Sequence, residues 1–338
     1  MELDTFLTTL YVIVDDWYRA EMSEMMKRHG GPALKMSDSE VLTLAVAGQW
    51  RAGVPWQSER GMVRYMQDHG RRWFPHMLGR SSFNERVRQL WAALIALHHH
   101  LAGWLTRAED IYECADCVPL PACSMAQSRK RGHWLWASRI GWGGNQGGWY
   151  YGEQLLVSSL PSGVVTGWLL GPADADDRWL FEAFLSQRSG QMQVVGPARH
   201  TKQVRTRSQL PASTTIGPLH SAAGHGHPRP YLADQGFNGP RWQHHWAQHY
   251  GAQVLTVPPA NMSLAWPLSA KRWLGRCRQI IESAFAWLTA CFSLSHLQAH
   301  SRWGQFTRLA AIFSAFNFGI LCNRLLGRPD GTLETLLT

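Results

Sequence analysis

The hydrophobic pattern of this chain changes its period close to Ile111, and that change constrains the fold more than any other feature. Before it, apolar residues such as Phe83, Val87 and Leu90 recur at the three- and four-residue spacing of an amphipathic helix. After it, residues 111–120 alternate between apolar and polar, which is the pattern of a strand. The sequence therefore predicts a helical domain over residues 1–108, an α/β domain over 109–326 and a C-terminal tail over 327–338.

Four helices are expected in the first domain, where breakers such as Gly53 and Pro55 separate the apolar stretches. Two of the helices begin at capping boxes, in which a Ser is followed three residues later by a Glu. The boxes are Ser37 with Glu40 and Ser82 with Glu85, and the four helices are expected to begin near residues 6, 37, 58 and 82.

The second domain is expected to contain three strands, a helix, a strand, a helix, a strand and a long helix. That order predicts a mixed sheet with helices on its faces, an α/β architecture. The expected strands cover 111–120, 149–158, 163–170, 231–234 and 253–257, with a further short strand at 192–195; the helices cover 178–187, 241–249 and the chain from 276.

The charge of the chain points to an anionic partner. Its 33 Lys and Arg exceed its 24 Asp and Glu, giving a formal net charge of +9. A basic stretch at 196–230 contains five cationic residues and no acidic one. Such a surplus favours nucleic acid, or less often an acidic membrane. An apolar fraction of 45% excludes wholesale disorder. Six irregularly spaced cysteines fit a reducing cytoplasm better than a disulfide scaffold.

No membrane segment is expected from the sequence. The N-terminus lacks the basic start and apolar stretch of a signal peptide. The longest apolar run, 309–322, is shorter than the roughly 20 residues that span a bilayer. We therefore expect an intracellular protein.

Three acidic residues stand out because burying a carboxylate is costly unless it is paired or binds a cation. Asp116 lies within the first strand, Asp234 ends the strand that begins at Tyr231, and Glu282 lies on the last helix. Carboxylates brought together suit Mg²⁺ or Mn²⁺. Each acid also has a structural interpretation: Asp116 as an edge residue, Asp234 as a turn former, and Glu282 as the i,i+4 partner of Arg278.

The arrangement resembles the DDE transposases of bacterial insertion sequences. The segment 81–86 is similar to a helix near the end of that family's N-terminal domain, and 149–152 to the opening of its second strand. Asp116 resembles the first acid of the family. Asp234, followed by Gly236 and Phe237, resembles the second, and Arg278 with Glu282 resembles the third-acid helix.

This resemblance implies an RNase H-like catalytic domain with a five-stranded mixed sheet, into which the basic loop at 196–230 is inserted. Asp116, Asp234 and Glu282 would be the catalytic triad and the ligands of two Mg²⁺ ions, for which Mn²⁺ can substitute. Asp116 would bridge both ions, and Asp234 and Glu282 would hold one each. The implied reaction is metal-dependent cleavage of DNA by water, followed by strand transfer from the freed 3′-hydroxyl.

The implied partners are double-stranded terminal inverted repeats and target DNA, bound by a homodimer at the bacterial nucleoid. Arg278 would orient Glu282 or contact the scissile phosphate. Arg129, Lys130 and Arg131 are expected to contact DNA backbone. The chain has Gly275 and Thr289 where the best-known branch has a Tyr and an end-binding Lys. Arg302 or Arg308 is expected to replace that Lys. The rival hypotheses are a catalytically silent DNA-binding protein and a nuclease that cuts without strand transfer.

Overall fold

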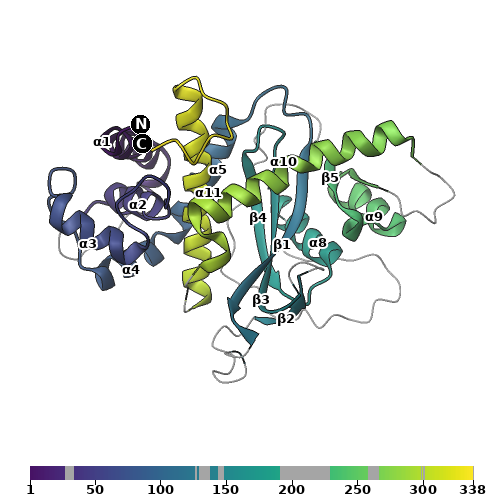
Figure 1. The fold of residues 1–338 in the computed structure, drawn as a ribbon, viewed down its shortest axis with the longest axis horizontal. Coiled ribbons are helices and arrows are strands. Elements are labelled where there is room, and N and C mark those ends of the chain that lie inside the picture. The colour runs from purple at the N-terminus through teal and green to yellow at the C-terminus, as the bar shows by residue number, and fades with distance from the viewer. Residues whose placement is uncertain are drawn as a thin grey trace. The chain divides into compact units, whose positions relative to one another are not determined.

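A computed structural model of the chain describes residues 1–26, 34–125, 128, 138–143, 148–190, 229–257, 266–297, 299 and 301–337 (Figure 1). The chain divides into two compact units. One joins Met1–Leu105 with Ala286–Thr338, and the other is Thr106–Phe285. The C-terminal residues from 286 onward, which the sequence assigned to the second domain and a tail, are thus grouped with the N-terminal helices.

The first unit is helical, as expected. The Ser37–Glu40 capping box is present, with the Ser37 hydroxyl accepting from the Glu40 amide and the Glu40 carboxylate accepting from the Ser37 amide. Ser58 caps the next helix through the amide of Gly61. The helices that precede the sheet are α1 (Leu3–Trp17), the π-helical turn Tyr18–Met22, α2 (Asp38–Ala47), α3 (Glu59–His69), α4 (Arg80–Gln89) and α5 (Trp91–Leu105).

The expected fourth helix is instead two helices. Helix α4 begins two residues before the predicted Ser82 box, with Gly79 at its N-cap, and ends at Gln89. Leu90 leaves the helical conformation with φ −92° and ψ 16°, and α5 starts at the next residue. The apolar spacing runs unbroken across this point, so the sequence carries no mark of the break.

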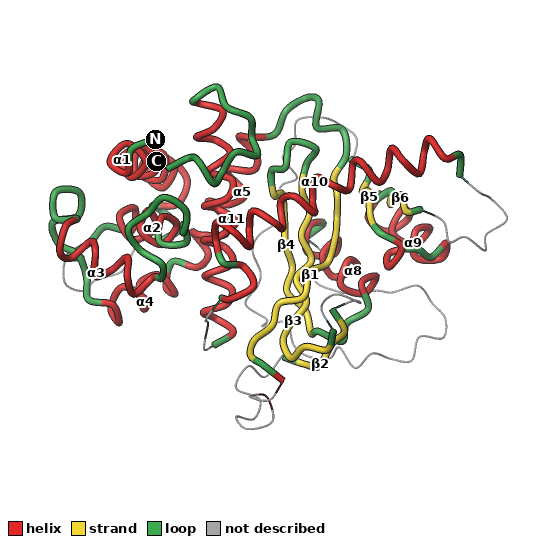
Figure 2. The backbone as a smooth tube through the Cα atoms, viewed as in Figure 1, coloured by secondary structure: helices red, strands yellow, loops and turns green. Residues whose placement is uncertain are grey.

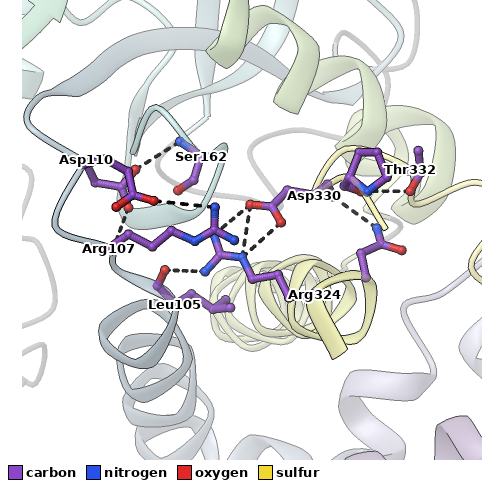
Figure 3. A network of polar contacts seen from close by, with 10 residues as sticks. Leu105, Arg107, Asp110, Ser162, Arg324, Asp330 and Thr332 are labelled. Atoms are coloured by element: carbon purple, nitrogen blue, oxygen red, sulfur yellow. Dashed lines mark hydrogen bonds and ion pairs between the residues drawn. The ribbon is translucent and has the colours of Figure 1, made fainter. Parts of the chain in front are cut away.

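Helix α11 (Arg302–Leu325) packs against α5 and α2 in the core of the helical unit. By length and composition Trp303–Leu325 is apolar enough to cross a membrane, but 94% of that apolar window is buried within the fold, as in a core helix. Near its end, Arg324 donates to the Leu105 carbonyl and to the carboxylate of Asp330 (Figure 3). The predicted tail is therefore packed, with Leu333, Leu336 and Leu337 buried.

The second unit is built on a six-stranded mixed sheet (Figure 2). Strand β1 pairs antiparallel with β3 on one side and parallel with β5 on the other, and β5 pairs parallel with β6. Strands β2 and β4 pair with successive parts of β3. The strands are β1 (Glu113–Cys123), β2 (Arg139–Trp142), β3 (Trp149–Ser159), β4 (Val165–Pro172), β5 (Tyr231–Ala233) and β6 (Val254–Thr256).

The expected mixed α/β order is confirmed, with two differences. Strand β2 was not expected, because its residues fall in a segment that reads as a loop. Helix α10 (Leu268–Phe292) begins eight residues before the predicted position 276. The expected strand at 192–195 and the basic stretch at 196–228 lie outside the described residues.

Helices cover both faces of the sheet, and the alternation of β1 assigns residues to each face. Ala115 packs with α8 (Asp177–Arg188) and α9 (Pro240–Tyr250), whereas Cys114 packs with Leu274 and Ile281 of α10. Asp116 follows the parity of Cys114 and therefore belongs to the α10 face. The position of each residue along β1 therefore determines whether its side chain faces α10 or faces α8 and α9.

A buried ion pair anchors the start of β1 to α8. Glu113 is 6% exposed, and its Oε2 accepts from Arg188 at 2.8 Å, Ser158 at 2.5 Å and Thr166 at 2.7 Å. Although burial raises the pKa of Glu113, Arg188 and the two hydroxyls hold it below its ordinary value. Because the same Arg188 nitrogen donates to the Tyr231 hydroxyl of β5, one guanidinium joins both central strands.

We predict that Glu113→Gln destabilises the protein by about 3–5 kcal/mol, because it leaves a buried guanidinium without its counter-charge. Urea unfolding measures the loss. Glu109→Gln is the matched control, since the Glu109 side chain is 72% exposed, and it should stay within about 0.5 kcal/mol of the native protein. Equal stability of the two variants would contradict the anchoring role of Glu113.

Candidate active site

The pairing of β1 with β5 places two acids next to each other at the C-terminal end of β5, beside the interior of β1. Ala115 lies opposite Ala233 in a parallel register. Asp116 and Asp234 are the next residues on the two strands, so they lie side by side where β5 ends. Both follow the parity that faces α10. Two acids 118 positions apart in the sequence thus meet because of strand register.

A third carboxylate reaches the same place from α8. A Cβ built on Gly236 would lie 2.4 Å from Oδ2 of Asp177 and 2.9 Å from Oδ1 of Asp234. Both carboxylate oxygens therefore lie close to Gly236, and a larger residue at this position would push them apart. The turn that the sequence suggested for Asp234 is also present, because its Oδ1 accepts from the Gly236 amide. Asp234 thus forms the turn and presents a carboxylate.

The neighbouring acids of α8 have different roles. Asp176 is the N-cap, accepting from the Arg178 amide at 2.9 Å and pairing with the Arg178 side chain at 2.6 Å. Asp177 is the first helical residue, and its Oδ1 accepts from Nε2 of Gln154 on β3 at 2.6 Å. From the sequence alone, Asp176 and Asp177 could supply a fourth acid, but a helix N-cap explains them more simply. The signal in the sequence is the pair of adjacent acids, because a helix N-cap uses only one of them.

The electrostatics of the three aspartates are unfavourable as they stand. Burial raises the pKa of Asp116 to about 6; Arg278 opposes this rise, and Asp234 and Asp177 add to it. Burial also raises the pKa of Asp177. The hydrogen bond from Gln154 lowers that pKa, and the charge of Asp234 raises it further. The mutual repulsion shows that these carboxylates share one electrostatic site.

Arg278 is the cation at this site. Its Nη2 lies 3.5 Å from Oδ2 of Asp116, and the two side chains are 24% and 19% exposed. Its Nε is buried and has no hydrogen-bond partner among the described residues. Arg278 therefore balances Asp116 and keeps an unused donor.

Glu282, the expected third acid, is placed differently. It lies on α10 one turn beyond Arg278, and its side chain is exposed. The structure groups Asp116 with Asp234 and Asp177, and Glu282 makes no hydrogen bond or ion pair with the described residues. Within the described part of the chain, no three His, Cys, Asp or Glu side chains lie close enough to hold a metal ion.

The expected DNA-contacting residues are only partly visible. Arg129, Lys130 and Arg131 lie outside the described residues. Arg302 begins α11 in the helical unit, and its side chain is likewise outside the description. Trp142 and Trp149, on the β2–β3 hairpin, are 52% and 64% exposed and meet edge to face.

The cysteines of β1 do not form a metal pair. Cys114 lies on the α10 face and donates to the Cys277 carbonyl at 3.3 Å, whereas Cys117 packs toward α8 on the opposite face. Residues three apart in a strand face opposite sides, so the two thiols cannot bind one ion.

Chemically, the site offers carboxylate oxygens from three separate elements and one guanidinium. Carboxylate oxygens are hard ligands of the type that Mg²⁺ and Mn²⁺ prefer. Burial is the main cause of the raised pKa values of Asp116 and Asp177, and a divalent cation would remove the carboxylate repulsion that adds to it. The donor set therefore fits such an ion, although the side chains are not gathered around one point.

Comparison of the chain with models of protein families, with curated proteins and with solved structures found no match.

We predict opposite stability effects for two adjacent substitutions in α8. At pH 7, Asp177→Asn should stabilise the protein, because a carboxyl whose pKa is raised by folding destabilises the fold once ionised. Asp176→Asn should cost roughly 0.5 kcal/mol, because it removes a favourable charge at a helix N-terminus. Urea unfolding of both variants is the measurement, and equal losses would show that Asp177 is an ordinary cap residue.

Proposed function

We propose that this chain is a DDE-type transposase of a bacterial insertion sequence, which cleaves DNA and transfers the cleaved strand. The observation that carries the proposal is the parallel register of β1 and β5, which puts Asp116 beside Asp234. A shared cation site needs acids that lie side by side, as Asp116 within β1 and Asp234 just after β5 do. The family resemblance supplies the reaction.

The topology supports an RNase H-like catalytic domain. Three long strands form an antiparallel meander in which β3 lies between β1 and β4. Two further strands follow, each after a helix, and extend the other edge of β1 in parallel. This is the strand and helix order that the resemblance implies, with β2 as an additional short strand.

Asp116 and Asp234 would hold Mg²⁺ or Mn²⁺, joined by Glu282 as the resemblance implies and by Asp177 as the geometry suggests. When bound, such ions activate the attacking oxygen and stabilise the leaving one. The chain's own residues position this chemistry. Asp234 is fixed by its turn at Gly236, Asp177 by Gln154, and Asp116 by β1.

Arg278 would bind the scissile phosphate. It pairs with Asp116 at 3.5 Å, a long contact, and its buried Nε has no partner among the described residues. A guanidinium has five donors in a planar fork, so it can contact Asp116 and a phosphate oxygen together. In this role Arg278 stabilises charge on the phosphate as the bond to it breaks.

The surplus of positive charge supports DNA as the substrate. The chain carries +9 formally, and cations that neutralise phosphates dominate affinity for DNA. Terminal inverted repeats and target DNA would be held by a homodimer, with Arg129, Lys130, Arg131 and Arg302 among the backbone contacts. The protein would act in the cytoplasm, at the nucleoid.

The test is cleavage of end-labelled DNA that carries the gene's own flanks, with Mg²⁺ or Mn²⁺. We expect nicks at the element's ends and, with target DNA present, joined products that require a free 3′-hydroxyl. Asp116→Asn and Asp234→Asn should each lower the rate about 100-fold or more, while DNA binding persists. Glu109→Gln, an exposed acid of the same unit, should cleave normally.

The same assay identifies the remaining acid. Glu282→Gln should also lose activity about 100-fold, and Asp177→Asn about tenfold. If Glu282→Gln cleaves normally while Asp177→Asn is inactive, Asp177 is the third ligand. Cleavage without joined products would indicate a nuclease. Binding of the ends without cleavage by the native protein, under both metals, would indicate a silent DNA-binding protein.

A further inference from the structure

The helical unit contains an arginine-rich cleft of about 250 Å³ that the proposed catalytic site does not use. Its walls come from the loop before α3, the first residues of α3 and α4, the segment after α10, and α11. The charged residues that line it are Arg51, Arg60, Arg80, Arg308 and Glu59, with His296 beside them.

Four arginines face a single carboxylate in this cleft. Glu59 pairs only loosely with Arg308, with 3.8 Å between Oε2 and Nη2. Arg51 has no ion-pair partner among the described residues. Burial, followed by repulsion from Arg308, lowers the pKa of Arg51 to about 10. Glu59 attracts Arg51 and Arg308, but one carboxylate among four arginines leaves a surplus of positive charge in the cleft.

The backbone hydrogen bonds that hold the two inner arginines in place use one nitrogen of each guanidinium. Nη1 of Arg51 donates to the carbonyls of Gly48 at 2.6 Å and Trp50 at 2.8 Å. Nη1 of Arg308 donates to the Leu297 carbonyl. Because a guanidinium carries five N–H donors, both side chains keep donors for a ligand while their positions are fixed.

We infer that this cleft binds a phosphate group, carried either by a DNA strand or by a free nucleotide. Guanidinium groups bind the oxygens of phosphate in a bidentate geometry, and one phosphate has enough oxygens and negative charge to contact more than one of the four arginines. Helices α3 and α4 both begin at the cleft, and helix N-termini attract anions. Its volume is below the about 300 Å³ at which drug-sized pockets begin, which suits a phosphate with an attached sugar.

Glu59 indicates which chemical groups accompany the phosphate in the ligand. Its Oε1 is buried without a hydrogen-bond partner among the described residues, so the cleft offers an acceptor beside its cations. A sugar hydroxyl or a base amino group attached to the phosphate would satisfy that oxygen. A free nucleotide carries both groups, whereas the dianion of inorganic phosphate has only its single P–OH as a donor.

This inference does not rest on the proposed catalytic function. The cleft belongs to Met1–Leu105 and Ala286–Thr338, and the aspartates belong to Thr106–Phe285. Binding can therefore be measured in EDTA, where a cleavage defect has no influence. Loss of cleavage in the aspartate variants says nothing about the cleft, and loss of binding in the arginine variants says nothing about the aspartates.

The test compares the native chain with Arg60→Ala/Arg80→Ala. Both arginines are exposed at the rim, so the double variant should fold normally, which thermal unfolding checks. Arg64→Ala is the matched control, because Arg64 is exposed on α3 and does not line the cleft. The probes are a labelled 12-base-pair duplex, deoxyadenosine monophosphate and inorganic phosphate, each at fixed ionic strength.

We expect the double variant to weaken binding of the duplex or of the mononucleotide at least tenfold, whereas Arg64→Ala changes it little. If the duplex is the ligand, the slope of log K against log salt should fall by roughly 1.8 for two lost phosphate contacts. Loss confined to the mononucleotide would assign the cleft to free nucleotides. Unchanged binding of all three probes in the double variant would overturn the inference.

Discussion

The parallel pairing of β1 with β5 determines the site of the α/β unit. Side chains alternate along a strand, so a slip of one residue would turn Asp116 away from α10 and break its alignment with Asp234. The register is held three residues before Asp116 by Glu113, whose partner Arg188 also donates to the Tyr231 hydroxyl of β5. One buried charged cluster therefore keeps the two strands aligned.

The unit contains two kinds of buried acid, and their environments separate their roles. Glu113 is fully compensated by a guanidinium and two hydroxyls, and its pKa is lowered despite burial. Asp116 and Asp177 are compensated only in part, and burial and their neighbours raise their pKa values. A structural acid stabilises the fold when ionised, whereas Asp116 and Asp177, when ionised, are repelled by Asp234. Perturbed carboxylates of this kind are typical of functional sites.

The sequence predicts what depends on local patterns and misses what depends on contacts between distant residues. Hydrophobic periodicity and helix-capping patterns predicted the strands, the helices and the capping box at Ser37. Strand β2 has only four residues, and its Gly141 lets the Ala173 backbone approach, which no periodicity records. The sequence alone explains Asp177 as part of a helix cap, because the residues that it contacts lie on other elements. The grouping of α11 with the N-terminal helices likewise arises from contacts between residues that lie more than 200 positions apart in the sequence.

Binding of Mn²⁺ to the full-length chain, followed by electron paramagnetic resonance, tests the central claim most directly. If Asp116 and Asp234 form a cation site, the native protein should bind Mn²⁺ saturably, with two ions per chain. Asp116→Asn/Asp234→Asn should lose that binding, while Glu109→Gln keeps it. Equal Mn²⁺ binding by the native protein and the double variant would contradict the claim, as would the absence of saturable binding in the native protein.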